Sequence, residues 1–92
     1  MENETKLEAL KRMKSIAGHV KGVEKMIGGD AYCIDVIKQI QAVEAALSKV
    51  STLLLEQHLH SCVITAVRGK DLKERERVLE EITGVFETAT KV

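Results

Sequence analysis

The sequence predicts an all-α fold built from two long helices followed by a short one. Of the 92 residues, 45% are hydrophobic, yet there is no proline or tryptophan and only one tyrosine and one phenylalanine. Strands would require more aromatic and turn residues, so this composition favours helices that pack through aliphatic side chains. A chain of this size buries only about 60 to 65% of the surface that it exposes when unfolded, so association with further copies would stabilise it.

The first helix is expected from about Thr5 to Ile27. Two lines of apolar residues, each with a spacing of seven, give it a face typical of coiled-coil packing. The lines are Ala9, Ile16 and Val23, and Met13, Val20 and Ile27. Gly28 and Gly29 are expected to end this helix, and Asp30 is the expected N-cap of the next one.

The second helix is expected from about Ala31 to Val67, because neither proline nor glycine interrupts that stretch. Cys33 therefore falls in its first turn. Two heptad lines run along this helix, with further apolar residues beside them, and a stripe this wide fits a helical bundle better than a two-stranded coil. The lines are Cys33, Ile40, Leu47 and Leu54, and Val36, Val43 and Val50.

A short third helix is expected to start at Asp71, after Gly69 caps the second helix. Glu74 lies three residues after Asp71 and completes a pattern similar to a capping box. We expect one domain over residues 1–92, because no low-complexity linker or internal repeat divides the chain. The apolar face of the third helix consists of Leu72, Val78, Leu79, Ile82, Val85 and Phe86.

The charge of the whole chain does not indicate a nucleic-acid partner, because 14 basic and 14 acidic residues cancel. Only a local excess of one sign could attract DNA. One exists in the first helix between residues 11 and 25, where five basic residues stand against a single acid, although a solvated helix face explains it equally well. The basic residues are Lys11, Arg12, Lys14, Lys21 and Lys25.

The other composition features exclude further classes. The N-terminus is acidic and no stretch of about 20 apolar residues is present, so we expect a cytoplasmic protein that does not contact a membrane. The sequence shows no set of residues arranged for acid–base catalysis, so we do not expect an enzyme.

The strongest chemical signal is His58 and Cys62, which a helix would place one turn apart on the same face. The other soft ligand is Cys33, but 25 residues of unbroken helix would put it about 37 Å from His58. Either the Cys33 thiol is unrelated to the pair, or a second subunit packed antiparallel brings its own Cys33 to His58 and Cys62. We take the second alternative as the working hypothesis.

Two thiolates and one imidazole form a soft ligand set, which suits Cu(I) better than a hard cation. Zn(II) is the second candidate, with a water or a fourth ligand completing a tetrahedron. His60 lies about 200° around the helix from His58 and should point into solvent. We assign no ligand role to His60 or to His19. The alternative for the ligand set itself is ordinary packing of a small buried thiol beside a polar histidine.

Three runs of sequence resemble the copper-sensing repressors of the CsoR family, and the resemblance extends over nearly the whole chain. They are residues 10–20 (LKRMKSIAGHV), 30–43 (DAYCIDVIKQIQAV) and 58–62 (HLHSC). The resemblance implies antiparallel four-helix-bundle dimers that assemble into a disc-shaped tetramer. It also implies a repressor that binds operator DNA when metal-free and is released by Cu(I), with Cys33 from one subunit and His58 and Cys62 from another as ligands.

The same resemblance implies roles for further residues. Tyr32 and Glu81 match a tyrosine and a glutamate that lie in a second shell around the copper, with Glu80 as the alternative for the glutamate. Arg12 and Lys49 match basic positions that contact DNA, and the neighbouring Lys11 and Lys14 are candidates for the same surface.

Departures from related sensors favour copper as the effector. Nickel and cobalt sensors similar to this family carry a histidine where this chain has Cys62, persulfide sensors lack the histidine found here at His58, and formaldehyde sensors lack the final cysteine. The alternatives that remain are a thiol or persulfide sensor, a sensor of Zn, Ni or Co, and a copper-buffering protein that does not bind an operator.

Overall fold

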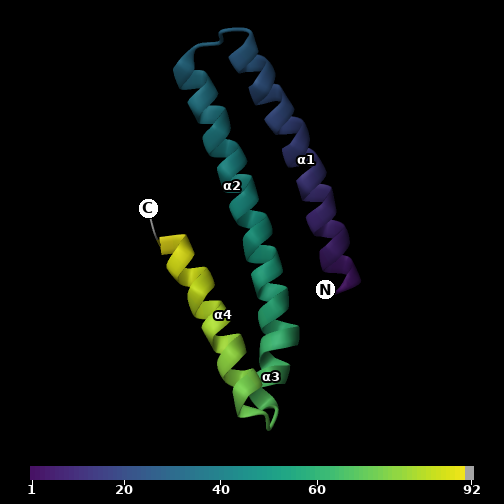
Figure 1. Cartoon of the computed structure of the whole chain (residues 1–92). Helices are drawn as coiled ribbons and strands as arrows, with labels where there is room; N and C mark the ends of the chain where they lie inside the picture. Colours follow the sequence, from purple (N-terminus) through teal and green to yellow (C-terminus); the bar gives the residue numbers. More distant parts are fainter. Residues whose placement is uncertain (91–92) are drawn as a thin grey trace. The chain divides into compact units, whose positions relative to one another are not determined.

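The computed structural model describes residues 1–90, with side chains for residues 1–88, and all its elements are helical. Helix α2, the wider π-helical turn η1 and α3 follow one another without a break, so the second expected helix is present as three consecutive segments. The all-α prediction with two long helices is confirmed. None of the described helices is long and apolar enough to cross a membrane. The elements are α1 (Asn3–Gly28), α2 (Cys33–His58), η1 (Leu59–Val63), α3 (Ile64–Arg68) and α4 (Leu72–Thr90) (Figure 1).

Contacts within the chain gather in two compact units, Met1–Leu55 and Glu56–Val92. In the first unit, α1 packs against the part of α2 that ends at Leu55, and one heptad line of each helix forms the core. The two lines contribute six residues, each at most 9% exposed. Burying an aliphatic side chain contributes about 1.5 to 3 kcal/mol, so this seam holds the helical hairpin together. The six residues are Ala9, Ile16, Val23, Val36, Val43 and Val50.

The second apolar line of α1 stays uncovered in the single chain. Met13, Val20 and Ile27 are 43%, 46% and 59% exposed. Ile40 and Leu47, which belong to the second line of α2, are also exposed. A continuous apolar stripe of this kind is typical of a surface that packs against another chain.

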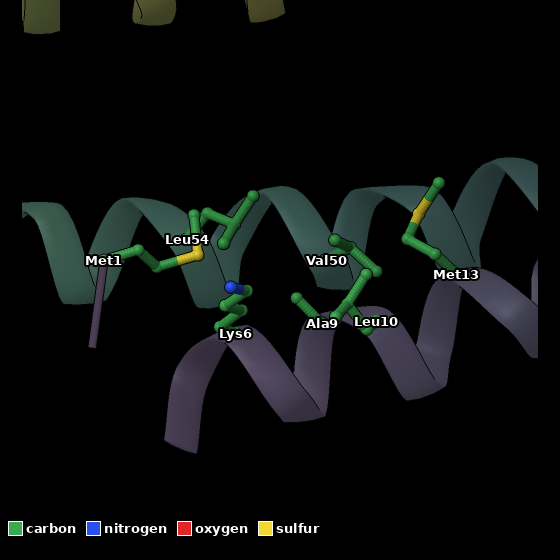
Figure 2. Close-up of a pocket in the computed structure, with 7 residues that line it drawn as sticks. All are labelled: Met1, Lys6, Ala9, Leu10, Met13, Val50 and Leu54. Carbon is green, nitrogen blue, oxygen red and sulfur yellow. The ribbon is translucent and has the colours of Figure 1, made fainter. Parts of the chain in front are cut away.

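The uncovered surface includes an apolar hollow of about 650 Å³ between α1 and α2. Figure 2 shows the side chains of Leu10 and Met13 from α1 and of Leu54 from α2 around it. Lys6 is the charged residue of this lining. The full lining is Met1, Lys6, Ala9, Leu10, Met13, Val50 and Leu54.

The loop between α1 and α2 corrects the role expected for Asp30. With φ of 58°, Asp30 adopts a left-handed conformation. Its N–H donates to the Ile27 carbonyl at 3.2 Å, and the Ala31 N–H donates to the Met26 carbonyl at 2.9 Å. These two bonds form a Schellman motif, which requires a left-handed residue at this position, and aspartate tolerates that conformation better than most residues. Asp30 therefore ends α1 and is not the N-cap of α2, which starts at Cys33.

In the second unit, η1, α3 and α4 pack together, with Val63 and Val78 buried. Gly69 ends α3, as predicted, and its N–H donates to the Thr65 carbonyl at 3.1 Å. The Gly69 carbonyl accepts a hydrogen bond from Arg75 Nη2 at 2.7 Å. This bond ties the turn after α3 to the first turn of α4.

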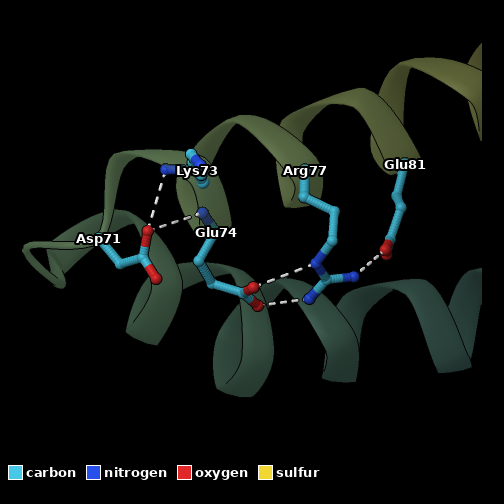
Figure 3. Close-up of polar contacts among 5 residues, drawn as sticks. All are labelled: Asp71, Lys73, Glu74, Arg77 and Glu81. Carbon is cyan, nitrogen blue, oxygen red and sulfur yellow. Dashed lines mark hydrogen bonds and ion pairs between the residues drawn. The ribbon is translucent and has the colours of Figure 1, made fainter.

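Asp71 caps the start of α4, as predicted. Its Oδ1 accepts hydrogen bonds from the backbone N–H groups of Lys73 at 3.0 Å and Glu74 at 3.2 Å (Figure 3). The expected capping box is only half formed, because both carboxylate oxygens of Glu74 accept hydrogen bonds from Arg77. The arginine one turn further along outcompetes the Asp71 backbone N–H for this carboxylate.

Candidate metal centre

Cys33 is the first residue of α2, and its thiol is free and exposed. The Val36 N–H donates to the Tyr32 carbonyl at 3.1 Å, so the first helical hydrogen bond forms directly around the cysteine. Tyr32 precedes the helix and is 69% exposed. Both side chains are therefore accessible to solvent at the start of α2.

His58 ends α2, and the helix becomes wider after it. In η1 the Ile64 N–H donates to the Leu59 carbonyl, five residues earlier. The sequence predicts a regular α-helical turn between His58 and Cys62, and this is wrong in detail because Cys62 lies inside the π-helical turn. His58 is half-buried and Cys62 is exposed. Short π-helical segments are rare and frequently occur at functional sites.

Ser61 connects the two sides of this wide turn. Its hydroxyl donates to the Gln57 carbonyl at 2.9 Å and accepts a hydrogen bond from the Gln57 side-chain amide at 2.8 Å. The same oxygen lies 3.6 Å from Cys62 Sγ. On the other side, Thr65 Oγ1 donates to the Ser61 carbonyl at 2.6 Å. The residue next to the cysteine is therefore bonded through both its side chain and its backbone.

A hollow of about 350 Å³ opens beside Cys62 in the second unit. Two carboxylates and one ammonium group share it with the thiol, so Cys62 lies on a polar surface that solvent reaches. Glu74 belongs to this lining and also to an ion cluster on α4. The lining consists of Ser61, Cys62, Thr65, Ala66, Gly69, Lys70, Asp71 and Glu74.

Glu81, which is predicted to lie close to the copper ligands, takes part in that ion cluster. The Arg77 guanidinium donates to the carboxylates of both Glu81 and Glu74 (Figure 3). The hydrogen bond from Arg77 lowers the pKa of the Glu74 carboxyl below its ordinary value, because it stabilises the charged form. The bond to Glu74, together with the charges of both carboxylates, raises the pKa of Arg77. Glu80 is exposed on the same helix, so the choice between Glu81 and Glu80 stays a prediction.

The four residues predicted to contact DNA are all exposed and all belong to the first unit. Lys11, Arg12 and Lys14 lie on α1, and Lys49 lies on α2. Arg12 Nε donates to Glu8 Oε1 at 3.0 Å, which is an exposed ion pair between successive turns. Such pairs contribute only about 0.3 to 0.5 kcal/mol, so a DNA phosphate can displace the glutamate at little cost.

The two histidines without an assigned ligand role differ in their surroundings. His60 is exposed within η1. His19 Nε2 lies 2.7 Å from Gln39 Oε1, and the amide oxygen accepts, so the imidazole N–H donates. This bond joins α1 and α2 within the first unit.

Sequence reasoning missed three residues that organise this region, namely Gln57, Ser61 and Arg77. The spacing of four between Gln57 and Ser61, and between Arg77 and Glu81, is the signal that could have identified them, because side chains four residues apart are neighbours on a helix. Among the residues that the structure describes, no three His, Cys, Asp or Glu side chains of one chain are grouped closely enough to hold a metal ion.

Comparison with known sequences identifies the family. Residues 5–88 match the profile of a family described as metal-sensitive transcriptional repressor. The copper-sensing transcriptional repressor CsoR of Bacillus subtilis is 41% identical over 80 residues, which are 87% of this chain and 76% of that protein. The copper-sensing transcriptional repressor RicR of Mycobacterium tuberculosis is 49% identical over 57 residues, which are 62% of this chain and 59% of that protein.

Solved structures give the same result. The copper-sensing repressor CsoR with Cu(I) from Geobacillus thermodenitrificans has a TM-score of 0.86 and 38% identity, and the match covers 99% of this chain and 92% of that chain. A variant of the formaldehyde-responsive regulator FrmR from Salmonella enterica serovar Typhimurium has a TM-score of 0.77 and 25% identity, and the match covers 95% and 96%. On this sequence and structural similarity, the chain belongs to the CsoR family of metal-sensitive transcriptional repressors, which are DNA-binding regulators and not enzymes.

Proposed function

We propose that this protein is a Cu(I)-responsive transcriptional repressor that binds operator DNA when metal-free and leaves it when Cu(I) binds. The observation that carries the proposal is the position of three soft ligands, Cys33 at the start of α2 and His58 and Cys62 around its end. The similarity to a repressor whose solved structure contains Cu(I) supports copper as the effector.

The proposed site is shared between two protomers. A 26-residue α-helix separates its first and last residues by about 37 Å, so Cys33 cannot reach His58 of its own chain. If two copies of α2 pack antiparallel, the start of each helix lies beside the end of the other. Each site then consists of Cys33 from one protomer and His58 and Cys62 from its partner.

The residues present fit Cu(I) chemically. Both cysteines are free thiols on the exposed surface, and the third ligand is a half-buried imidazole. Sulfur and imidazole ligands in a set of three favour a soft monovalent ion, whereas Zn(II) would need a water or a fourth ligand. Cu(I), when bound, supplies a soft cationic centre that joins ligands of two chains and so favours one arrangement of the subunits.

The uncovered apolar lines support a homodimer and, from it, a homotetramer. Met13, Val20 and Ile27 on α1 and Ile40 and Leu47 on α2 are exposed in the single chain, although their spacing is that of a packed seam. An antiparallel four-helix bundle of two protomers would cover one set of lines. Exposed apolar residues that remain would then pack dimers into a tetramer.

Tyr32 and Glu81 are proposed to lie around the copper ligands. Tyr32 directly precedes Cys33 and exposes its phenol, which can donate to a ligand atom. The carboxylate of Glu81 would have to leave Arg77 to take part, and Glu80 remains the alternative. The role of Arg77 would then be to hold the carboxylate when no copper is bound.

DNA contact is proposed for Arg12 and Lys49, with Lys11 and Lys14 beside Arg12. All four are exposed, and a repressor built from symmetric copies would present each of them several times. Contacts of this kind neutralise phosphates and position the protein on the duplex.

Copper and DNA are proposed to act against each other through the arrangement of subunits. If the copper-bound arrangement fits the operator less well, the two ligands weaken one another by the same factor, because coupling between binding sites is reciprocal. A tenfold loss of DNA affinity needs a coupling free energy of only about 1.4 kcal/mol.

An anaerobic titration tests the proposal. The reduced protein is bound to a labelled DNA fragment from its own upstream region, and Cu(I), Zn(II), Ni(II) and a persulfide donor are added in parallel. We expect release at about one Cu(I) per subunit, because each symmetric interface repeats the site for every chain. Cys33→Ala and His58→Ala should abolish this release, and the matched control His60→Ala should not.

Other outcomes would identify the alternatives. Release by the persulfide donor alone, retained in His58→Ala, would indicate a thiol sensor. Release by Zn(II) or Ni(II) at a lower concentration than Cu(I) would identify that metal as the effector. Tight Cu(I) binding without binding to any operator fragment would indicate a copper-buffering protein.

A further inference from the structure

We infer that Ser61 is a positioning residue for the Cys62 sulfur and so sets how tightly the metal centre holds Cu(I). The inference rests on the proposed function, because it concerns the same site. Ser61 is not a ligand itself. It acts through the sulfur atom of the next residue, which lies 3.6 Å from the Ser61 hydroxyl oxygen.

The hydrogen bonds of Ser61 account for its whole bonding capacity. A hydroxyl has one proton and two acceptor lone pairs. The proton is donated to the Gln57 carbonyl at 2.9 Å, and one lone pair accepts the Gln57 side-chain amide at 2.8 Å. In the metal-free protein the remaining lone pair faces Cys62 Sγ, and the thiol can donate to it. When a metal displaces the thiol proton, the hydroxyl can rotate and donate to the sulfur instead, because either atom of this contact can be the donor.

The position of Ser61 in the wide turn makes these bonds important for Cys62. Gln57 belongs to α2, and Thr65, whose hydroxyl donates to the Ser61 carbonyl at 2.6 Å, belongs to α3. Ser61 thus fastens the π-helical turn to the α-helical segments on both sides. A regular α-helical turn is narrower, so a change in this turn would redirect the Cys62 side chain relative to His58.

Other hydroxyls among the described side chains make only part of this arrangement. Thr52 donates to the Ser48 carbonyl at 3.1 Å, and Thr83 donates to the Leu79 carbonyl at 3.0 Å, both with the ordinary spacing of four. Bonds of this type are common in helices and contribute little to stability. Ser61 differs because its oxygen also accepts a side-chain amide and contacts a sulfur, and Thr52 therefore serves as a matched control.

The experiment compares Ser61→Ala, Ser61→Thr and Thr52→Ala with the wild type, as full-length reduced proteins under anaerobic conditions. Cu(I) affinity is measured by competition with a chromogenic Cu(I) chelator, and backbone hydrogen exchange of residues 59–63 is measured in the metal-free protein. Ser61→Ala should weaken Cu(I) binding about 3- to 10-fold, the factor that corresponds to one hydrogen bond. It should also accelerate exchange in η1, whereas Ser61→Thr should restore most of both properties.

A second variant keeps the test informative if Ser61→Ala folds poorly. Gln57→Met removes the amide that fixes the hydroxyl and leaves Ser61 in place, and it should weaken Cu(I) binding in the same direction by a smaller factor. Cu(I) affinity of Ser61→Ala equal to that of Thr52→Ala would overturn the inference. Faster exchange with unchanged affinity would also overturn it, because the hydroxyl would then be only structural.

The failure of this inference is distinguishable from failure of the proposed function. If the wild type binds Cu(I) and Ser61→Ala binds it equally well, only the role of Ser61 is disproved. A wild-type protein that does not bind Cu(I) at all overturns both.

Discussion

Cys33 and His58 are the first and last residues of a single helix, α2, which contains 26 residues. For both to bind one metal ion, two chains must contribute, and this can be tested with mixed subunits. Chains carrying Cys33→Ala and chains carrying Cys62→Ala should each bind no Cu(I). After unfolding and refolding of a 1:1 mixture, about one quarter of the wild-type Cu(I) capacity should return, because half of the dimers are mixed and each restores one of its two sites.

The control mixture combines His58→Ala with Cys62→Ala, two changes on the same half of the proposed site. In mixed dimers every site then lacks one ligand, so no strong Cu(I) binding should return. Equal recovery in both mixtures, or none in either, would contradict a site shared between chains.

The ion cluster on α4 gives a prediction about acid stability. The pKa of Glu74 is lowered from 4.5 because Arg77 binds its carboxylate. A carboxyl with a lowered folded-state pKa stabilises the protein fully above its unfolded value, and this contribution is lost as pH falls through the lower folded value. The melting temperature of the wild type should therefore fall with acidification below about pH 4.5 more steeply than that of Arg77→Gln.

Lys73→Gln removes a cation from the same helix and is the matched control for this measurement. Its melting temperature should keep the wild-type slope at low pH. Because Glu74 and Arg77 are exposed, the difference between Arg77→Gln and the wild type should shrink as salt is added. A slope for Arg77→Gln that equals the slope of the wild type would show that the cluster does not contribute to folding.

The heptad lines illustrate how far the sequence predicts this fold. They place both long helices correctly and identify Ala9, Ile16 and Val23 as core candidates, because apolar periodicity reports which faces avoid water. They do not reveal which of two equivalent lines a single chain buries. That choice depends on which line meets the partner helix, and the remaining line, including Val20, stays exposed.

The differences from the predicted fold have local physical causes. The residue type of Asp30 predicts a cap for α2, but the end of α1 requires one left-handed residue and Asp30 takes that role. The π-helical turn could not be predicted, since the same helix-forming residues are compatible with both i+4 and i+5 bonding. The sequence could name Cys33, His58 and Cys62 as candidate ligands, but binding of all three to one metal ion would require a second chain.

The Glu8–Arg12 pair leads to a prediction about DNA binding. Arg12→Gln should weaken operator binding and reduce the salt dependence of log K by about 0.9 for each phosphate that Arg12 neutralises in the wild type. Glu8→Gln should instead strengthen operator binding, because it releases the Arg12 guanidinium for a phosphate. Binding is measured by fluorescence anisotropy at several salt concentrations.

Lys38→Gln is the control for these two variants, since Lys38 is exposed on α2 and lies outside the set of residues predicted to bind DNA. It should change affinity less than Arg12→Gln does. Similar reductions for Lys38→Gln and Arg12→Gln would mean that the protein responds to total charge and that Arg12 has no specific role in DNA binding.

The exposed line on α1 gives a prediction that connects assembly with copper binding. Val20 is 46% exposed in the single chain but has the spacing of a packed seam. Val20→Glu would place a charge in the proposed contact between chains, where burying it without a partner is unfavourable, while the core of the helical hairpin is untouched. In sedimentation velocity the variant should form a smaller species than the wild type, and its Cu(I) capacity should fall although all three ligands are intact. Lys21→Glu introduces the same side chain at the next position, on the polar side of α1, and should keep both the assembly and the copper capacity. If the two variants sediment alike, this line is not the contact between subunits.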